Sequence, residues 1–503
     1  MTPKKKNILL ITSDQQHWFT IGRLNPQIKT PNLDRLCDQG ICFDRAYTVN
    51  PTCTPTRASI ITGKYPSQHG AWTLGTKLME KEQTIGDAFI NAGYRTALIG
   101  KAHFQPLRET DTHSSIEAYP TLQDLAFWGK FSGPFYGFGH IELARNHTNE
   151  AHVGQHYALW LEEKGCHNWR EYFLPPTGTM ERSESTVWNI PEKYHYNTWI
   201  AERTNAFINQ CSDNHENFFL WASFPDPHPA YLVPEPYASM YNPESLTLRL
   251  DTEKNEYGSA FHKISQEKSY DISEYKKSGY FLHGVHSHLY DEQTMRKQAA
   301  VYYGMVTMMD KYIGKILNKL DELGLSEDTA VIFTSDHGHF FGQHGLTAKG
   351  PFMYEDLIKV PFIVRCPGQK KTGIISNAMQ STVDLTETFL NICDIPLPDG
   401  TAGINQKDVW LGLAENVRSW ASCEHHHEYG SIHLRTYINK SYKITLYDPI
   451  DYGELFDLEK DPNEYNNCWN NPDYSNIKIQ LLYEFGLAEM KKEPKYMERI
   501  ADA

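Results

Sequence analysis

The sequence predicts an α/β protein with a large, mostly parallel sheet flanked by helices, followed by a smaller antiparallel subdomain. Three observations support this fold class: short apolar runs recur from Asn7 to Arg365, helical patterns lie between them, and the pattern changes after residue 412. Continuous apolar runs suit strands that are buried on both faces, as in parallel sheets. The alternation of such strands with helices is typical of an open α/β sheet.

Five apolar runs are predicted as strands of this sheet. They are Asn7–Thr12, Arg95–Ile99, Phe218–Phe224, Ala330–Thr334 and Pro361–Arg365. Three segments between them are predicted as helices. The first, Thr30–Gly40, has a capping threonine, a proline at the first helical position and a glycine at its end. The others, Thr84–Ala92 and Thr307–Leu323, each end directly before a glycine.

Residues 1–412 are predicted to form the main α/β domain and residues 413–503 the smaller subdomain, with several short strands and turns. Two long, aromatic and irregular segments interrupt the alternation, at about 105–191 and about 229–294. We expect both to be insertions at the mouth of the sheet, where substrate selection usually lies.

The composition excludes several classes of partner. A formal net charge of −14 argues against nucleic acid or an anionic membrane as the main partner, because both attract basic surfaces. The nine cysteines form no CxxC pair, which indicates a reduced chain. The lysines near the N-terminus precede only the short apolar run Ile8–Ile11, whereas a signal peptide needs at least about 7 apolar residues. We therefore expect a cytoplasmic protein.

Polar side chains follow four of the predicted strands. In open α/β sheets the ligand crevice lies outside the carboxyl ends of the strands, so these side chains are expected at one edge. They are Asp14 and Gln15, Lys101 and His103, His228, and Asp336 and His337. Such a coincidence in four distant segments predicts a functional site.

The residue types divide this site by chemistry. Asp14, Gln15, Asp336 and His337 supply three hard oxygen donors and one nitrogen, a set that suits Ca²⁺ or Mg²⁺ and also admits Mn²⁺ or Zn²⁺. The interpretation leaves alternatives open, since Asp14 and Asp336 could be caps and Gln15 a turn residue. The combination nevertheless favours one divalent metal ion.

Cations and histidines complete the predicted site. Arg57, Lys101 and Lys349 can hold a tetrahedral anion, although lysines such as Lys349 are more often solvated surface groups. His103 and His228 can move protons near neutral pH. Together these residues predict the hydrolysis of an anionic ester, with metal and cations stabilising the transferred group.

Cys53 stands immediately before a predicted helix. Pro55 fits the first turn of that helix and Thr62-Gly63 its end, so Cys53 would lie beside the free N–H groups at the positive helix end. This is an anion-binding position. A buried, inert thiol is the usual state of a free cysteine, and it would require none of these neighbours.

The run Cys53-Thr54-Pro55-Thr56-Arg57, with Thr62-Gly63 downstream, resembles the signature of the type I sulfatases. The resemblance extends over most of the chain, from Asp14-Gln15 through Ser335-Asp336-His337-Gly338 to the late run Gly453–Pro462. It implies an alkaline-phosphatase-like fold and a maturation enzyme that converts Cys53 to formylglycine. The hydrate of that residue would be the nucleophile, next to a metal ion, most simply Ca²⁺, that residue 53 also ligates.

Three positions depart from the common pattern of that family. Thr56 replaces serine or alanine, Gln15 replaces the second aspartate of a pair, and His337 stands where many members have asparagine. The combination of Asp-Gln with Asp-His is found in carbohydrate-directed sulfatases and is similar to that of the phosphonate monoester hydrolases.

The predicted activity is therefore hydrolysis of a small anionic sulfate ester, such as a sulfated saccharide. A phosphonate or phosphate (di)ester hydrolase using the same site is the nearest alternative. A non-catalytic binder of sulfated glycans would follow if Cys53 stayed unconverted, and a phosphatase with Thr54 or Thr56 as nucleophile is a more distant interpretation. The run His425-His426-His427 is not predicted as a metal site, because consecutive strand side chains point apart. His339 and His344 are candidate contacts around the site.

Overall fold

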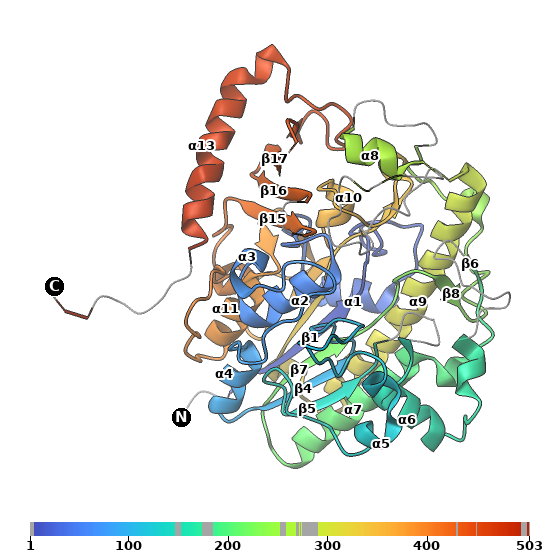
Figure 1. The fold of residues 1–503 in the computed structure, drawn as a ribbon. Helices are drawn as coiled ribbons and strands as arrows, with labels where there is room; N and C mark the ends of the chain where they lie inside the picture. Colours follow the sequence, from blue (N-terminus) through green and yellow to red (C-terminus); the bar gives the residue numbers. More distant parts are fainter. Residues whose placement is uncertain are drawn as a thin grey trace.

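The computed structural model describes residues 5–145, 152–173, 185–251, 258–267, 271, 273, 290–428, 431–448, 450–493 and 500–501. Most of the chain surrounds one large sheet, and a second sheet lies above it toward the C-terminus (Figure 1). Within the described residues, no helix combines the length and the apolar character that a membrane span requires.

The large sheet has eight strands. In spatial order they are β13 (Ile374–Ser376), β2 (Ile41–Phe43), β12 (Phe362–Arg365), β9 (Thr329–Ser335), β1 (Asn7–Ser13), β7 (Phe218–Ser223), β4 (Arg95–Gly100) and β5 (His140–Leu143). The five strands from β9 to β5 are parallel, whereas β12 runs antiparallel to both of its neighbours. All five predicted strands are confirmed to within two residues at each end.

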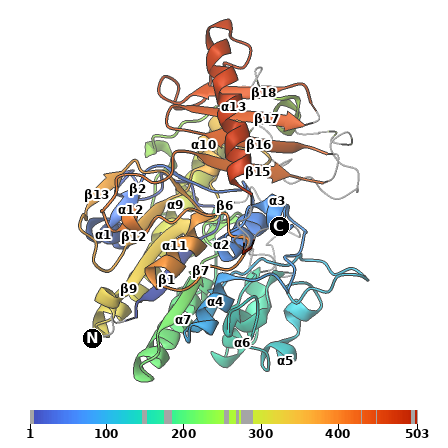
Figure 2. The same ribbon diagram turned by 90° about the vertical axis from the view of Figure 1, so that its left-hand side faces the viewer.

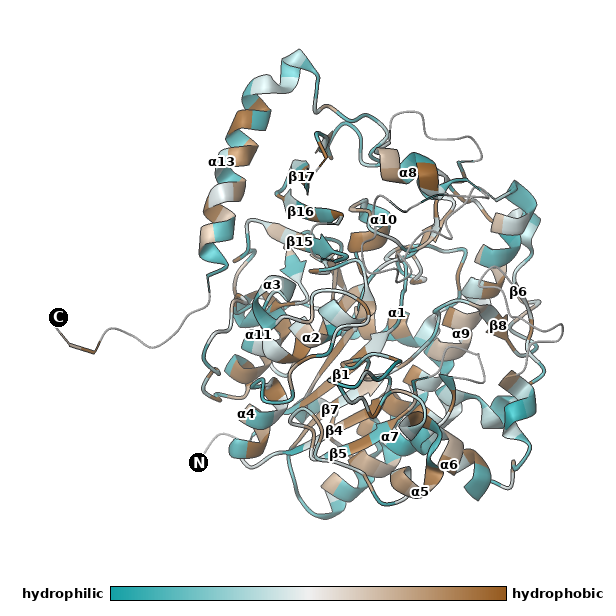
Figure 3. Cartoon of the chain, in the orientation of Figure 1, coloured by the Kyte–Doolittle hydropathy of each residue, from teal (hydrophilic) through white to brown (hydrophobic). Residues whose placement is uncertain are grey.

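The central strands are apolar because helices cover both faces of the sheet. Successive residues of β1 alternate between the two cores: Leu9 and Ile11 belong to one, Ile8 and Leu10 to the other. Figure 3 shows the apolar colouring gathered on β1, β7 and β4, inside the layers of helices. The first face is covered by α1 (Pro31–Gln39), α6 (Gln155–Glu163), α7 (Tyr196–Asp213) and α9 (Glu292–Glu322). The second face is covered by α2 (Cys53–Thr62), α4 (Ile85–Asn91), α11 (Asp384–Ile392) and α12 (Lys407–Trp410).

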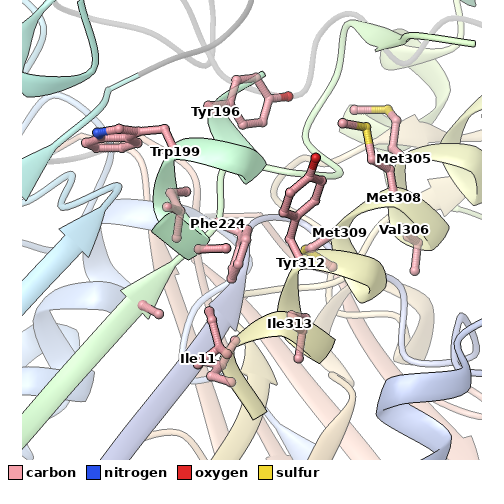
Figure 4. Packing of buried hydrophobic residues seen from close by; sticks show 14 of the residues in the cluster. Ile11, Tyr196, Trp199, Phe224, Met305, Val306, Met308, Met309, Tyr312 and Ile313 are labelled. Carbon is pink, nitrogen blue, oxygen red and sulfur yellow. The ribbon is translucent and has the colours of Figure 1, made fainter. Parts of the chain in front are cut away.

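The packing on the first face is dense and aromatic. Ile11 of β1, Phe224, just after β7, and Ile313 of α9 belong to one buried cluster (Figure 4). Each of these three side chains is fully buried. Burying a side chain of this size stabilises the fold by about 1.5–3 kcal/mol. The parallel pairing of β1 with β7, on which this core packs, fixes the ends of the two strands relative to each other.

Helix α9 begins earlier than predicted. It starts at Glu292 rather than near Thr307, and the Asp291 side chain caps it by accepting a hydrogen bond of 2.9 Å from the N–H of Thr294. Gly304 lies inside the helix, where the carbonyl of Tyr237 approaches so closely that an added Cβ would lie 2.2 Å from its oxygen. Gly304 therefore does not end the helix, and only glycine leaves room for the Tyr237 backbone to pack against α9 at this position. The helices predicted before Gly40 and Gly93 are confirmed as α1 and α4.

The segment at about 105–191 is not solely an insertion. It contributes β5, which pairs with β4 in parallel register, and α6 beneath it. It also contains α5 (Leu125–Trp128) and β6 (Ser185–Val187). The segment at about 229–294 contains β8 (Tyr231–Val233) and α8 (Ala260–Ser265), and much of its remainder lies outside the described residues.

The C-terminal part forms the predicted antiparallel sheet. Its strands are β15 (Ala421–His426), β16 (His433–Ile438), β17 (Tyr442–Asp448) and β18 (Gly453–Asp457), in that order, and α13 (Ser475–Lys491) packs across them (Figure 2). Strand β15 docks on the segment that precedes α2: the N–H of Glu424 donates to the carbonyl of Val49 (2.8 Å), and the Asn50 amide donates back to the carbonyl of Glu424 (2.6 Å).

Candidate active site

The carboxyl ends of four parallel strands bring the predicted side chains together. The loops after β1 and β7 are joined by a hydrogen bond from the N–H of Asp14 to the carbonyl of Asp226 (3.0 Å). The loops after β1 and β9 are joined by a bond from the N–H of Gln15 to Oδ1 of Asp336 (3.0 Å). The parallel register of β1 with β9 therefore fixes the spacing between Asp14 and Asp336.

One cluster in the described part of the chain has the composition of a metal site. Asp14, Cys53, Asp336 and His337 each offer one ligand atom, and these atoms lie within 4.8 Å of one another. All four residues are buried. The Gln15 side chain is also buried, and its Oε1 has no hydrogen-bond partner among the described residues. Two carboxylates, an imidazole and an unpartnered amide oxygen fit a divalent cation.

Helix α2 places Cys53 in this cluster. Thr52 has extended backbone angles at the N-cap, Cys53 is the first helical residue, and Gly63 ends the helix in the left-handed region at φ 66°. Every residue of α2 is buried. The Cys53 Sγ lies 3.0 Å from Nζ of Lys349, 3.2 Å from Nε2 of His337 and 3.5 Å from Oδ1 of Asp14.

Three cations surround the thiol. The Arg57 Nε donates to Oδ2 of Asp336 (2.8 Å), and Lys101 forms an ion pair with Asp14. The Arg57 Nη2 is buried and has no partner among the described residues. Lys349 is 4% exposed and contacts Cys53, so it is not a solvated surface lysine. A buried guanidinium N–H and two ammonium groups can bind the oxygens of a tetrahedral anion.

The charges of the site perturb its acids and bases. Burial by itself raises the pKa of Asp14, but the charges of Lys101, His228, Arg57 and Lys349 outweigh it and hold that pKa well below its ordinary value. Burial and the neighbouring Lys349 lower the pKa of His337 to about 4. Near neutral pH the cluster therefore contains an ionised carboxylate and a neutral imidazole, which are the forms that bind metals.

The two other histidines lie at this edge of the sheet. The Nε2 of His228 is 3.3 Å from Nζ of Lys349, and its Nδ1 donates to the carbonyl of Pro229 (2.6 Å). His103 is buried in the loop after β4, and burial, with the charges of Arg145 and Lys101, lowers its pKa well below the ordinary value. All the predicted site residues thus converge on one region.

Sequence reasoning missed the groups that hold the His103 loop. The Glu117 carboxylate accepts hydrogen bonds from the N–H groups of His103 (2.8 Å), Phe104 (2.8 Å) and Gln105 (3.0 Å), and it pairs with Arg145 at 2.9 Å. Both side chains of the pair are 1% exposed. Arg145 follows β5 as the other site residues follow their strands, so recognition of β5 as a strand would have found it.

We predict that Glu117→Ala lowers the free energy of unfolding by about 3–5 kcal/mol, because it leaves the Arg145 charge buried without its counter-ion. Chemical denaturation monitored by tryptophan fluorescence measures this change. The control is Asp111→Ala, an exposed acidic residue of the same segment, which should change the stability by less than about 0.5 kcal/mol. An equal effect of both substitutions would contradict the assigned role of Glu117.

The remaining candidate histidines lie outside the cluster. His344 stacks on Tyr354, with 3.8 Å between ring centroids. His426 stacks on His433 across β15 and β16 at 4.5 Å, and among the described residues the histidine run belongs to no metal-type cluster. His339 contacts the Gln15 side chain at 3.0 Å.

Comparisons with known proteins agree with this arrangement. The model of the sulfatase family matches residues 6–395, and one described as N-sulphoglucosamine sulphohydrolase, C-terminal, matches residues 342–493. An arylsulfatase of Clostridium perfringens is 30% identical over 500 residues, which cover 97% of this chain and 95% of the relative. An N-acetylglucosamine-6-O-sulfatase of Bacteroides thetaiotaomicron is 27% identical over 503 residues, with 95% and 85% covered.

Among solved structures, a phosphonate monoester hydrolase of Agrobacterium radiobacter superposes with a TM-score of 0.79 at 21% sequence identity, covering 98% of this chain and 100% of that one. The predicted alkaline-phosphatase-like α/β fold, with its large mixed sheet and its C-terminal antiparallel sheet, is therefore confirmed. Because the first family match spans well over half of the 503 residues, this chain belongs to the sulfatase family of sulfuric ester hydrolases.

Proposed function

We propose that this protein hydrolyses the sulfate ester of a small sulfated saccharide through a formylglycine made from Cys53. One observation carries the proposal: the Cys53 side chain meets Asp14, His337 and Lys349 within 3.5 Å at the start of a fully buried helix. In this arrangement Sγ stands for the hydroxyl oxygens of hydrated formylglycine. A relative that is 27% identical over nearly the whole chain is named for desulfation of N-acetylglucosamine, which supports a sugar substrate.

The residues present fit one divalent cation, and we propose Ca²⁺ because oxygen donors predominate. Asp14, Gln15, Asp336 and His337, with the modified residue 53, would hold it. When bound, such an ion supplies Lewis-acid polarisation of the sulfate and lowers the pKa of a hydroxyl group next to it.

The first step transfers the sulfuryl group to the protein. Asp14 Oδ1, which lies 3.5 Å from Sγ and is ionised at neutral pH, accepts the proton of one hydroxyl of the diol as that oxygen attacks sulfur. Arg57, Lys101 and Lys349 bind the sulfate oxygens and stabilise the charge that develops on them. His228, next to Lys349, protonates the alcohol that leaves, so the S–O bond breaks without release of an alkoxide.

The second step releases sulfate. His103, which is neutral at pH 7 because its pKa is lowered by burial and by neighbouring cations, takes the proton of the second hydroxyl. The C–O bond to the sulfate then breaks, and the aldehyde of residue 53 forms again. Splitting one displacement into two steps is the advantage of a covalent nucleophile.

A phosphonate or phosphate diester hydrolase is the second candidate. It is supported by the close superposition of a solved phosphonate monoester hydrolase, and the Gln15 and His337 positions are compatible with either candidate. The same cations would bind a phosphonate as readily as a sulfate, because both are tetrahedral anions.

Parallel assays distinguish the two candidates. We expect kcat/KM for 6-O-sulfated N-acetylglucosamine and for 4-nitrophenyl sulfate to exceed that for 4-nitrophenyl phenylphosphonate by at least about tenfold, equivalent to about 1.4 kcal/mol of transition-state binding. Turnover of the phosphonate above that of every sulfate tested would reverse the assignment. Turnover of neither class by protein with a converted residue 53 would contradict both.

A further inference from the structure

Gln15 is the neutral member of the predicted metal ligands, and its amide poses a problem of orientation. The oxygen and the NH₂ group of an amide are nearly the same size, but only the oxygen can ligate a hard cation. A carboxylate at this position would present an oxygen in either orientation. An amide needs a neighbour that distinguishes its two ends.

The structure contains such a neighbour. The Gln15 Nε2 lies 3.0 Å from Nδ1 of His339, and Nε2 of His339 lies 3.2 Å from the hydroxyl of Tyr231. The Gln15 Oε1 is buried at the opposite end of the amide, without a partner among the described residues. The N–H of Gln15 donates to Asp336, so this free oxygen belongs to a residue that is already tied to the metal-type cluster.

The protons follow from these contacts. The amide NH₂ has only hydrogens to offer, so Nδ1 of His339 must accept and the ring proton lies on Nε2, where it points at the hydroxyl of Tyr231. With the amide reversed, the ring would have to take the other tautomer, with its proton on Nδ1 and Nε2 accepting from the Tyr231 hydroxyl. Only the tautomer with a free lone pair on Nδ1 can accept the NH₂ group while the amide oxygen ligates a cation.

The ring of His339 is itself held in place. It is fully buried and stacks on Tyr302, with ring centroids 4.8 Å apart and an interplanar angle of 26°, while Phe341 packs against it edge to face at 4.8 Å. The Tyr302 hydroxyl donates to the carbonyl of Gln15 (2.7 Å), so the same aromatic residue fixes both the ring and the Gln15 backbone. Side chains that are locked in this way transmit orientation to a ligand.

We propose that His339, held by Tyr231, is a positioning residue that turns the amide oxygen of Gln15 toward the bound metal ion. This inference rests on the proposed function, since it takes Gln15 to be a metal ligand. It also explains how the chain accommodates glutamine at this position: the acceptor at His339 makes the amide present an oxygen, as a carboxylate would.

Titration calorimetry with Ca²⁺ on the metal-free protein tests the proposal, using two variants of matched shape. His339→Asn retains an acceptor oxygen near the place of Nδ1, whereas His339→Leu has the same branching and no acceptor. We expect His339→Leu to weaken Ca²⁺ binding by about 10–100-fold, the usual effect of losing a hydrogen-bond partner of a metal ligand. The Ca²⁺ affinity of His339→Asn should stay within about threefold of that of the wild type. The unfolding temperature of each metal-free variant is measured as well, because a merely structural role would lower that temperature without changing the affinity difference.

Several results would overturn the inference. Unchanged Ca²⁺ affinity in His339→Leu would do so, as would equal losses in both variants. If His339→Leu does not fold, His339→Gln replaces it as the variant without an acceptor at the place of Nδ1, because the longer glutamine side chain carries its amide toward Tyr231. A Ca²⁺ affinity of His339→Gln equal to that of His339→Asn would then contradict the proposal. Asp336→Ala separates this test from the proposed function: if wild type and Asp336→Ala bind Ca²⁺ equally, the metal site itself is wrong.

Discussion

Replacing Cys53 with alanine is expected to lower kcat for sulfate-ester hydrolysis by about 10⁴–10⁶-fold, the scale on which loss of a covalent nucleophile acts. The side chain is 1% exposed and lies 3.0 Å from Lys349 and 3.2 Å from His337, so no other hydroxyl or thiol occupies its place among the residues described in the cluster. Water would have to replace a nucleophile that helix α2 holds in a fixed position. Initial rates with 4-nitrophenyl sulfate measure the loss.

A second cysteine provides the control for this substitution. Cys211 on α7 is also buried and free, but it lies in the hydrophobic core beneath the sheet. We expect Cys211→Ala to keep most of the activity. Mass spectrometry of the peptide around residue 53 should show a loss of about 18 Da relative to cysteine in the active protein. If Cys53→Ala retained a large fraction of wild-type turnover, or if fully active protein showed no mass change, the assignment of a formylglycine at position 53 as the nucleophile would be wrong.

Replacing His228 with glutamine is expected to lower kcat by about 10²–10⁴-fold on sugar sulfates, because an amide cannot deliver a proton to the departing alcohol. His228 lies at the edge of the site, where Nδ1 donates to the carbonyl of Pro229 (2.6 Å) and Nε2 lies 3.3 Å from Nζ of Lys349. A sugar alkoxide leaves poorly unless it is protonated, whereas 4-nitrophenolate leaves without help. The loss on 4-nitrophenyl sulfate should therefore stay below about tenfold.

This difference between substrates is the decisive measurement for His228. The two leaving groups are compared in the same variant, so changes in stability or metal content affect both rates alike. An equal loss on both substrates would indicate that His228 binds the sulfate group and does not act as the acid. In that case Lys349, which also contacts Cys53, would be the next residue to test.

Much of the site could be predicted because it follows from local pattern. Asp14, Lys101, His228 and Asp336 each come soon after an apolar run, and the carboxyl ends of parallel strands meet at one edge of a sheet. The positions of Pro55 and Gly63 also predicted helix α2, although the structure includes Cys53 as its first residue rather than placing it directly before the helix.

The groups around the site were less accessible, because their partners are distant in the chain. Glu117 lies 14 residues from His103 and 28 from Arg145, and no spacing rule connects such positions. Strand β5 was not predicted either. It spans only His140–Leu143 and contains two polar residues, His140 and Glu142, and the Glu142 carboxylate pairs with Arg203 of α7. A strand at the edge of a sheet carries a weaker apolar signal than a central one.

The sequence by itself therefore determined the family, the fold class and the central strands, and it predicted the candidate site residues, since each of these depends on residue types at short spacing. Only the tertiary structure decided that Lys349 is buried against Cys53, that Glu117 clamps the His103 loop, and that His339 meets the amide of Gln15. The physical reason is that burial and hydrogen-bond partnership are properties of three-dimensional packing. Segments hundreds of residues apart in the chain, such as Gln15 and His339, acquire a relation only when the sheet brings their strands together.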